Sequence, residues 1–433
     1  MENISKNELK SRIKNLKNLN DKIHELLNKI PVKIPEQIKE QIIDKLFEQE
    51  ELEELVNALK YERPPKLMFI GRTGVGKSSL INAIFKEYMA EISDVEIGTK
   101  NTIKYEFKEG GETKLEVLDT RGIGESEIED KTAEEILKED INKFKPDAIV
   151  FLVRAKDRSR LDKDIKELSE INKLVNDKFP IICVSTQVDE LAPSRFVDPN
   201  NYPPKKIKNI NEAENQLRRL LNKYNIEFID LVSVSSYIEW SFPNIDEPIY
   251  NIDKLSKEDK RRLVIKNDFS YNIDDLIDTL ANNMELKAKI NLLLNLRIDK
   301  ALDKVSDNLI NSFAKVAGGI GATPIPGSDI KILTPLQILM IMLIAYLGGK
   351  ELDVKTARDF LLSVGGNLAL GLGFQQLAKV LNISIPGSGS AVSGSIAYGG
   401  TKFIGNVARR YYIEGYNKKE LKEFIQNENI KND

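Results

Sequence analysis

One stretch constrains the fold of this chain more than any other. The apolar run of residues 67–70 passes directly into Gly71-Arg-Thr-Gly-Val-Gly-Lys-Ser-Ser, and a helix-forming segment continues to Phe85. Glycines in such a loop let backbone N–H groups approach phosphate oxygens, and its lysine can reach the terminal phosphates. This order of strand, loop and helix therefore predicts an α/β domain with a phosphate-binding loop, or P-loop.

The whole loop is expected to contact a bound nucleotide. Lys77 would neutralise charge on the reacting phosphates, and the Ser78 hydroxyl would ligate Mg²⁺. The predicted nucleotide-binding residues of the loop are Gly71, Arg72, Thr73, Gly74, Val75, Gly76, Lys77, Ser78 and Ser79.

Short apolar runs alternate with helical stretches through the middle of the chain. The predicted strands are residues 67–70, 115–118, 148–153, 181–184 and 228–234, with an alternating edge strand at 104–107. This alternation predicts a mostly parallel sheet with helices on both faces.

Asp119-Thr-Arg-Gly122 follows the second of these strands. Asp119 can hold Mg²⁺ through water, and the Gly122 amide can contact the γ-phosphate. A threonine from the loop before residue 104 would complete the metal site. Thr99 is the preferred candidate for this catalytic and metal-binding role, because Thr102, which is the alternative, already begins a strand.

Thr186-Gln-Val-Asp189 follows the strand at 181–184. The Asp189 carboxylate can accept hydrogen bonds from both guanine N1 and the exocyclic N2, whereas adenine offers no such pair of donors. Thr186 and Gln187 are expected beside the base, and a backbone amide of Ser235 or Ser236 would meet guanine O6. These residues predict GTP and GDP as the ligands.

These elements in this order, with "GRTGVGKSSLINAIF" and "DTRGIGE", resemble the Era-like branch of translation-factor-related GTPases, and more distantly the immunity-related GTPases. The resemblance covers about residues 64–285 and implies hydrolysis of GTP to GDP and phosphate. In fast relatives, a glutamine directly after the Asp-x-x-Gly motif orients the attacking water. Ile123 occupies that position here, so the expected intrinsic rate is slow.

The first 63 residues form a predicted all-α arm. Its apolar positions follow a heptad seam made of Leu9, Ile13, Leu16, Asn20, Ile23, Leu27 and Ile30. Two alternatives fit this pattern: a coiled coil that forms a homodimer, or an amphipathic helix packed on its own protein. A second helix is predicted from residue 36 to 60. A homodimer through the GTPase domain is a further alternative.

The remaining residues divide into a connecting helix (286–302), a hydrophobic all-α domain (303–412) and a polar tail (413–433). Residues 312–349 carry few charges and include the apolar run from Leu336 to Leu347. "ATPIPGSDIKILTPLQILMIMLIAYLGG" resembles the YcjF-type helical domain of unknown function, for which that family suggests membrane association. The run is marginal for a membrane span, so membrane lipid and a buried helix bundle stay open as its surroundings.

The net charge and the number of cysteines indicate which partners and which cellular compartment to expect. The formal net charge of −3, from 64 basic and 67 acidic residues, gives no global basic excess, so nucleic acid is not an expected partner. Cys183 is the single cysteine, which fits a reducing cytoplasm. We therefore expect a cytoplasmic GTP switch, with peripheral or integral attachment to the cytoplasmic face of a membrane. The alternatives are a soluble RNA- or ribosome-linked assembly GTPase and a GTP-dependent oligomeric scaffold.

Overall fold

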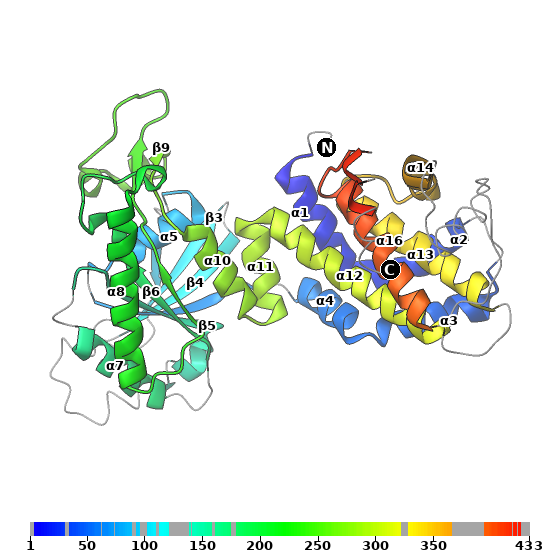
Figure 1. The fold of residues 1–433 in the computed structure, drawn as a ribbon, viewed down its shortest axis with the longest axis horizontal. Coiled ribbons are helices and arrows are strands. Elements are labelled where there is room, and N and C mark those ends of the chain that lie inside the picture. The colour runs from blue at the N-terminus through cyan, green and yellow to red at the C-terminus, as the bar shows by residue number, and fades with distance from the viewer. Residues whose placement is uncertain are drawn as a thin grey trace. The chain divides into compact units, whose positions relative to one another are not determined.

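A computed structural model provides the structure of the chain (Figure 1). It describes residues 4–30, 34–61, 63–72, 74–88, 92–95, 102–109, 112–120, 138–139, 141–157, 161–174, 179–321, 328–365, 394–417, 419–421 and 423–425. The chain divides into two compact units. We call Arg63–Leu296 the α/β unit, and we call residues 1–62 together with 297–433 the helical unit.

The α/β unit is built on a sheet whose strands run in the order β2-β3-β4-β1-β5-β6-β7. The strands are β1 (Lys66–Ile70), β2 (Ile92–Val95), β3 (Thr102–Glu109), β4 (Glu112–Thr120), β5 (Ala148–Arg154), β6 (Ile181–Thr186) and β7 (Asp230–Ser233). From β4 to β7 all neighbours are parallel, while β2–β3 and β3–β4 are antiparallel. The predicted mostly parallel sheet and each of its predicted strands are confirmed.

Helices cover both faces of this sheet because successive side chains of a central strand point to opposite sides. Met68 and Ile70 of β1 join an apolar cluster with α7 (Leu161–Leu174) and α8 (Pro204–Lys223). Leu67 and Phe69 face the other way and are also buried. Figure 1 shows α8 along one face and α5 (Lys77–Phe85) with α10 (Ile273–Asn282) on the other. The α/β unit closes with α11 (Leu286–Leu296).

The sequence did not predict two features of the α/β unit. One is β2, which pairs with β3 at the edge of the sheet. The other is a separate antiparallel hairpin, β8 (Ile238–Ser241) with β9 (Val264–Asp268), whose strands are joined by a segment containing the short helix α9 (Lys257–Lys260). Their apolar patterns are too short to stand out from loops.

The helical unit combines both ends of the chain. Its helices are α1 (Lys6–Asn15), α2 (Leu19–Lys29), α3 (Glu36–Phe47), α4 (Glu50–Lys60), α12 (Ile298–Gly321), α13 (Ser328–Leu347), α14 (Val354–Gly365) and α16 (Gly394–Tyr412). α12 packs against α16, α4 and α1. The sequence predicts one connecting helix at 286–302. The structure has two helices there, α11 and the beginning of α12. The predicted helix at 36–60 is likewise two helices, α3 and α4.

The predicted heptad seam is wrong at Asn20. Asn20 is exposed and Leu19 is buried instead, because the 3-10 turn Leu16–Asn18 shifts the phase between α1 and α2. Ile13, Ile23 and the other buried seam residues lie inside the chain's own helical unit. The structure therefore shows the packed alternative for this segment.

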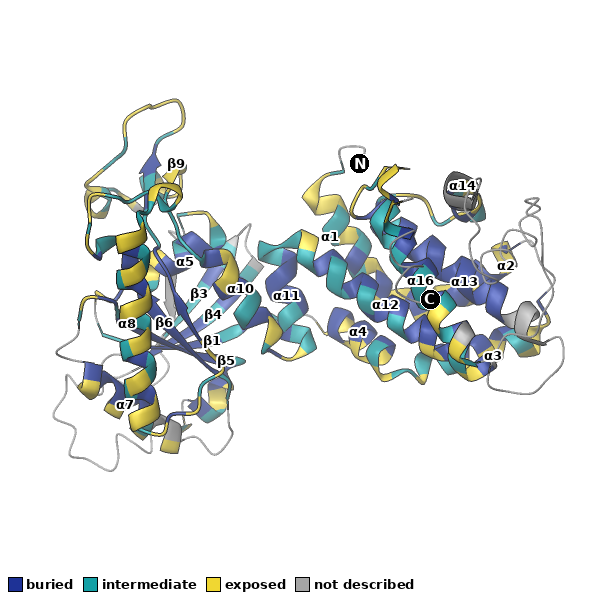
Figure 2. Cartoon of the chain, viewed as in Figure 1, coloured by how far each residue is buried: buried dark blue, intermediate teal, exposed yellow. Residues whose placement is uncertain are grey.

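The apolar run Leu336–Leu347 lies in α13, and every residue of the run except the half-buried Tyr346 is buried (Figure 2). Gln337 within the run donates a 2.9 Å hydrogen bond to the Thr401 hydroxyl of α16, so its polar group is satisfied inside the unit. Among the residues that the structure describes, no helix has both the length and the apolar character that crossing a membrane requires.

Candidate functional site

The P-loop connects the end of β1 to the start of α5, as predicted. A side chain on Gly71 would place its Cβ 2.7 Å from the Leu152 carbonyl oxygen, and Gly76 adopts a φ of 97°. Both positions therefore require glycine. The N-terminus of α5 directs its first N–H groups and its partial positive charge toward this loop, which favours a bound phosphate.

Lys77 and Asp119 meet at the carboxyl edge of the sheet. The Lys77 ammonium donates a 2.6 Å hydrogen bond to the Gly71 carbonyl and lies 3.0 Å from Asp119 Oδ1. This juxtaposition follows from the parallel pairing of β1 with β4, which places Phe69 opposite Asp119. Asp119 is buried, so its carboxylate is held in place beside the P-loop.

The oxygen donors near the P-loop suit Mg²⁺ bound together with a nucleotide. Ser78 is exposed in the first turn of α5, and Asp119 supplies a carboxylate. Mg²⁺ commonly takes one or two protein oxygens and completes its shell with phosphate oxygens and water. Within the described ranges, no three His, Cys, Asp or Glu side chains gather as a metal cage.

Several predicted site residues lie outside the described residues: Thr73, Thr99, Gly122 and Ile123. Thr102 opens β3, in agreement with its interpretation as a strand residue. Ser79 is exposed in the first turn of α5, next to Ser78. The choice of Thr99 over Thr102 therefore stays a prediction.

Arg72 binds another side chain of the α/β unit. Its guanidinium forms an ion pair and hydrogen bond with Asp164 of α7. Burial raises the pKa of Asp164, and the positive charge of Arg72 acts in the opposite direction. Arg72 thus ties α7 to the P-loop in this structure, a partner that the sequence did not suggest.

Thr186 supports the P-loop. Its buried hydroxyl lies 2.7 Å from the Val75 carbonyl oxygen and 3.1 Å from that of Val153, which places it between β6, β5 and the loop. The side chain expected beside the base is therefore committed to backbone carbonyls.

Gln187 makes a second connection to the P-loop. It adopts a left-handed φ of 57°, and its Nε2 donates a 3.1 Å hydrogen bond to the Gly74 carbonyl. Asp189 follows in a short 3-10 turn, Val188–Glu190, and is half-buried. The predicted base-recognition segment is thereby held directly against the predicted phosphate-binding segment.

Ser235 and Ser236 follow β7 and have different roles. Ser235 is buried, and it exchanges backbone hydrogen bonds of 3.2 and 2.9 Å with Tyr271. Its hydroxyl accepts a 3.2 Å bond from the Tyr237 amide. Ser236 is half-buried, and of the two it is the residue whose N–H can be offered to a base.

Sequence reasoning missed Asp164 and Lys206. Lys206, in the first turn of α8, is fully buried, and its ammonium reaches the loop that begins at Asp189. Neither residue carries a local signal, because lysine and aspartate on a charged helix normally face solvent.

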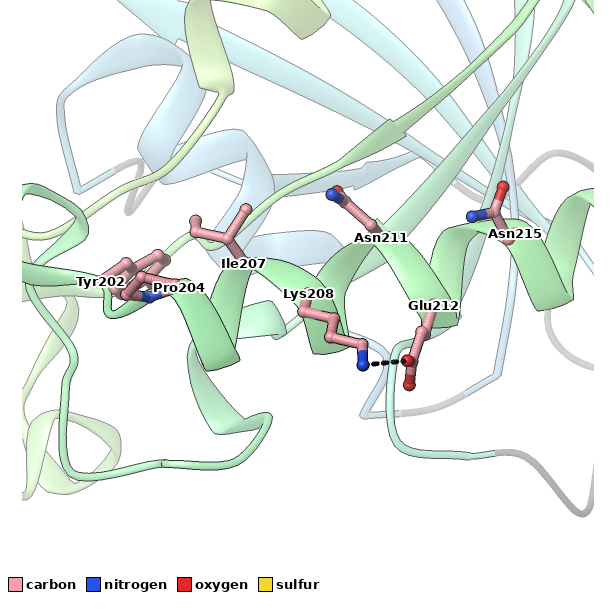
Figure 3. Close-up of a pocket in the computed structure, with 7 residues that line it drawn as sticks. All are labelled: Tyr202, Pro204, Ile207, Lys208, Asn211, Glu212 and Asn215. Carbon is pink, nitrogen blue, oxygen red and sulfur yellow. Dashed lines mark ion pairs between the residues drawn. The ribbon is translucent and has the colours of Figure 1, made fainter.

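A separate open pocket lies along α8 (Figure 3). Its lining residues are Tyr202, Pro204, Ile207, Lys208, Asn211, Glu212 and Asn215. None of them belongs to the predicted nucleotide motifs, so the pocket is distinct from the P-loop site.

The P-loop, Asp119, the segment 186–189 and the pair Ser235–Ser236 lie at the carboxyl ends of the parallel strands β1, β4, β6 and β7, and therefore at one edge of the sheet. Residues 66–186 match the family model described as 50S ribosome-binding GTPase. The α/β unit is thus a P-loop GTPase domain, with homology to the GTPases MnmE and Der.

The chain is 26% identical over 299 residues to the tRNA modification GTPase MnmE of Mycoplasmoides gallisepticum, covering 65% of this chain and 54% of that protein. It is 31% identical over 114 residues to the uncharacterized protein YfjP of Escherichia coli, covering 26% of this chain and 38% of that protein. The chain therefore spans about half or less of each of these two relatives.

Among solved structures, the LeoA bacterial dynamin GTPase from ETEC aligns with a TM-score of 0.32 and 16% identity, over 87% of this chain and 64% of that one. The resemblances to Era-like proteins, to immunity-related GTPases and to the YcjF-type domain stay predictions.

Proposed function

We propose that this chain is a GTP-binding switch that hydrolyses GTP slowly to GDP and phosphate. The observation that carries the proposal is the attachment of the base-recognition segment to the P-loop, through Thr186 to Val75 and through Gln187 to Gly74. This attachment supports a shared site, in which the P-loop would hold the phosphates and Asp189 would offer its carboxylate to guanine.

The roles follow from the chemistry of each group. Lys77 would contact the β- and γ-phosphates, while Ser78 and Asp119 would hold Mg²⁺. Asp189 would accept both guanine donors, and the Ser236 amide would donate to O6. Thr99 and the Gly122 amide would contact Mg²⁺ and the γ-phosphate.

Ile123 sets the expected rate. An apolar side chain cannot orient the attacking water, so turnover of the purified protein should lie within a few orders of magnitude of about 10⁻⁴ s⁻¹. Fast turnover that is independent of protein concentration would show that another group of the same chain supplies this role.

Calorimetric titration with GDP, GTP, ADP and ATP in the presence of Mg²⁺ tests the ligand. We expect binding of the guanine nucleotides, with at least tenfold weaker binding of the adenine nucleotides, because only guanine offers Asp189 two donors. Equal affinities for ADP and GDP would refute guanine recognition.

The first hypothesis for the cellular role is that the protein acts at the cytoplasmic surface of a membrane. In this version the helical unit must open, because α13 is buried inside it. Flotation with liposomes tests this in the GTP, GDP and nucleotide-free states. Absence from the floating fraction in all three would leave a GTP switch with a buried helical partner unit.

A soluble RNA- or ribosome-linked role is the second version. It is supported by the description of the matching family and by the similarity to a tRNA modification GTPase. Co-sedimentation with large ribosomal subunits should then depend on GTP. The scaffold alternative loses most of its proposed contact surface, because Ile13 of α1 and Ile23 and Leu27 of α2 are buried in the chain's own helical unit.

A further inference from the structure

Lys206 is unusual because its whole side chain is removed from solvent. An ammonium group in such a place is costly unless its donors are satisfied. The Lys206 Nζ lies 2.5 Å from the Asp189 carbonyl oxygen, 3.1 Å from that of Leu191 and 3.4 Å from that of Pro193. The face of the Tyr202 ring lies 4.8 Å away and adds a cation–π contact.

All three carbonyls belong to the loop that starts at the predicted guanine-binding residue. A second side chain of α8 also binds this loop, because Asn209 Nδ2 donates a 2.7 Å hydrogen bond to the Ala192 carbonyl. The first two turns of α8 therefore hold the backbone from Asp189 to Pro193. The buried charge is compensated in this way only while that loop keeps its present shape.

The negative charge of Asp189 also acts on Lys206. Burial lowers the pKa of Lys206, and the negative charge of Asp189 raises it, so the two opposite charges interact.

We propose that Lys206 is a positioning residue for guanine selectivity, which fixes the Asp189 backbone so that the carboxylate meets both N–H donors of the base. Lys206 does not contact the nucleotide in this proposal and acts through Asp189. The inference rests on the proposed guanine recognition.

The test compares GDP with inosine diphosphate, which lacks the exocyclic amino group and offers Asp189 one donor fewer. Wild-type protein should bind GDP about tenfold more tightly than inosine diphosphate, as expected for a hydrogen bond to a charged group. Lys206→Met should weaken GDP binding about tenfold and bring this ratio close to one.

Lys208→Met is the matched control. Lys208 lies two residues further along α8, is exposed and pairs with Glu212 across one helical turn. This variant should keep both the GDP affinity and the wild-type ratio.

The outcomes separate the positioning role from a purely structural one. A Lys206→Met protein with a lower Tm but an unchanged ratio would overturn the inference while guanine recognition stands. Wild-type protein that does not distinguish GDP from ADP would overturn both.

If Lys206→Met does not fold, Asn209→Ala provides the same measurement with less disturbance, because Asn209 is only half-buried. It should lower the ratio about two- to threefold, as expected for loss of one ordinary hydrogen bond. An unchanged ratio of GDP affinity to inosine diphosphate affinity in Asn209→Ala would then count against the proposal that α8 positions the loop.

Discussion

The Thr186 hydroxyl lies 2.7 Å from the Val75 carbonyl oxygen and joins the end of β6 to the P-loop. The two residues are 111 positions apart, yet both are buried at the same edge of the sheet. Because this bond spans the two halves of the proposed nucleotide site, its loss should affect both folding and binding.

Thr186→Val should test this link. Valine keeps the shape of threonine but leaves the Val75 and Val153 carbonyls without this donor, which should cost about 1–3 kcal/mol of unfolding free energy. Urea denaturation measures the loss, and GDP affinity should fall with it. Thr186→Ser retains the hydroxyl and should keep most of the affinity; an equal loss of affinity in both variants would show that the hydroxyl alone does not account for the effect.

Asp189→Asn should weaken GTP binding at least tenfold, because an amide cannot accept both guanine donors and replacing a charged partner costs about 1.5–3 kcal/mol. Fluorescent-nucleotide titration measures this change. Glu190→Gln is the neighbouring control, since Glu190 pairs with Arg154 and Lys156 rather than with a base. A similar loss in both variants would show that charge in general, and not Asp189, determines binding.

Lys77→Ala should abolish nucleotide binding, because it removes the cation that would contact the phosphates. Lys86→Ala serves as the control at the other end of α5, where Lys86 pairs with Asp268 at 2.5 Å. Equilibrium dialysis with labelled GTP measures both variants. Normal binding by Lys77→Ala would remove the P-loop assignment.

Cys183 should be inert in the folded protein. It is fully buried in β6, and burial raises the pKa of its thiol from 9.0 to about 12. A thiol reagent such as dithionitrobenzoate should label it only after denaturation. Labelling of the native protein at the same rate would contradict this burial.

The same shift has a consequence for stability. Because the unfolded thiol loses its proton near pH 9 and the folded thiol near pH 12, Cys183 has no effect below pH 9 and increasingly favours unfolding above it. The difference in unfolding free energy between wild type and Cys183→Ala should therefore change as pH rises from 9. A difference that stays constant across that range would contradict the shift.

Local patterns in the sequence were sufficient to predict the P-loop, the strands that surround it and the order of the nucleotide motifs. Each is encoded within a few neighbouring residues, as at Gly76, whose left-handed φ of 97° disfavours other side chains. The pairing of β1 with β4 then brings Lys77 to Asp119 without further information.

Tertiary structure alone decided which side chains those motifs contact. Arg72 meets Asp164 because α7 contacts the P-loop, and Lys206 is buried because α8 packs on the loop that starts at Asp189. The sequence pattern also did not determine what the N-terminal helices pack against, because a heptad seam suits the surface of a partner chain and the core of its own chain equally well. A single 3-10 turn at Leu16–Asn18 changed the phase of that seam, and packing within the helical unit buried it.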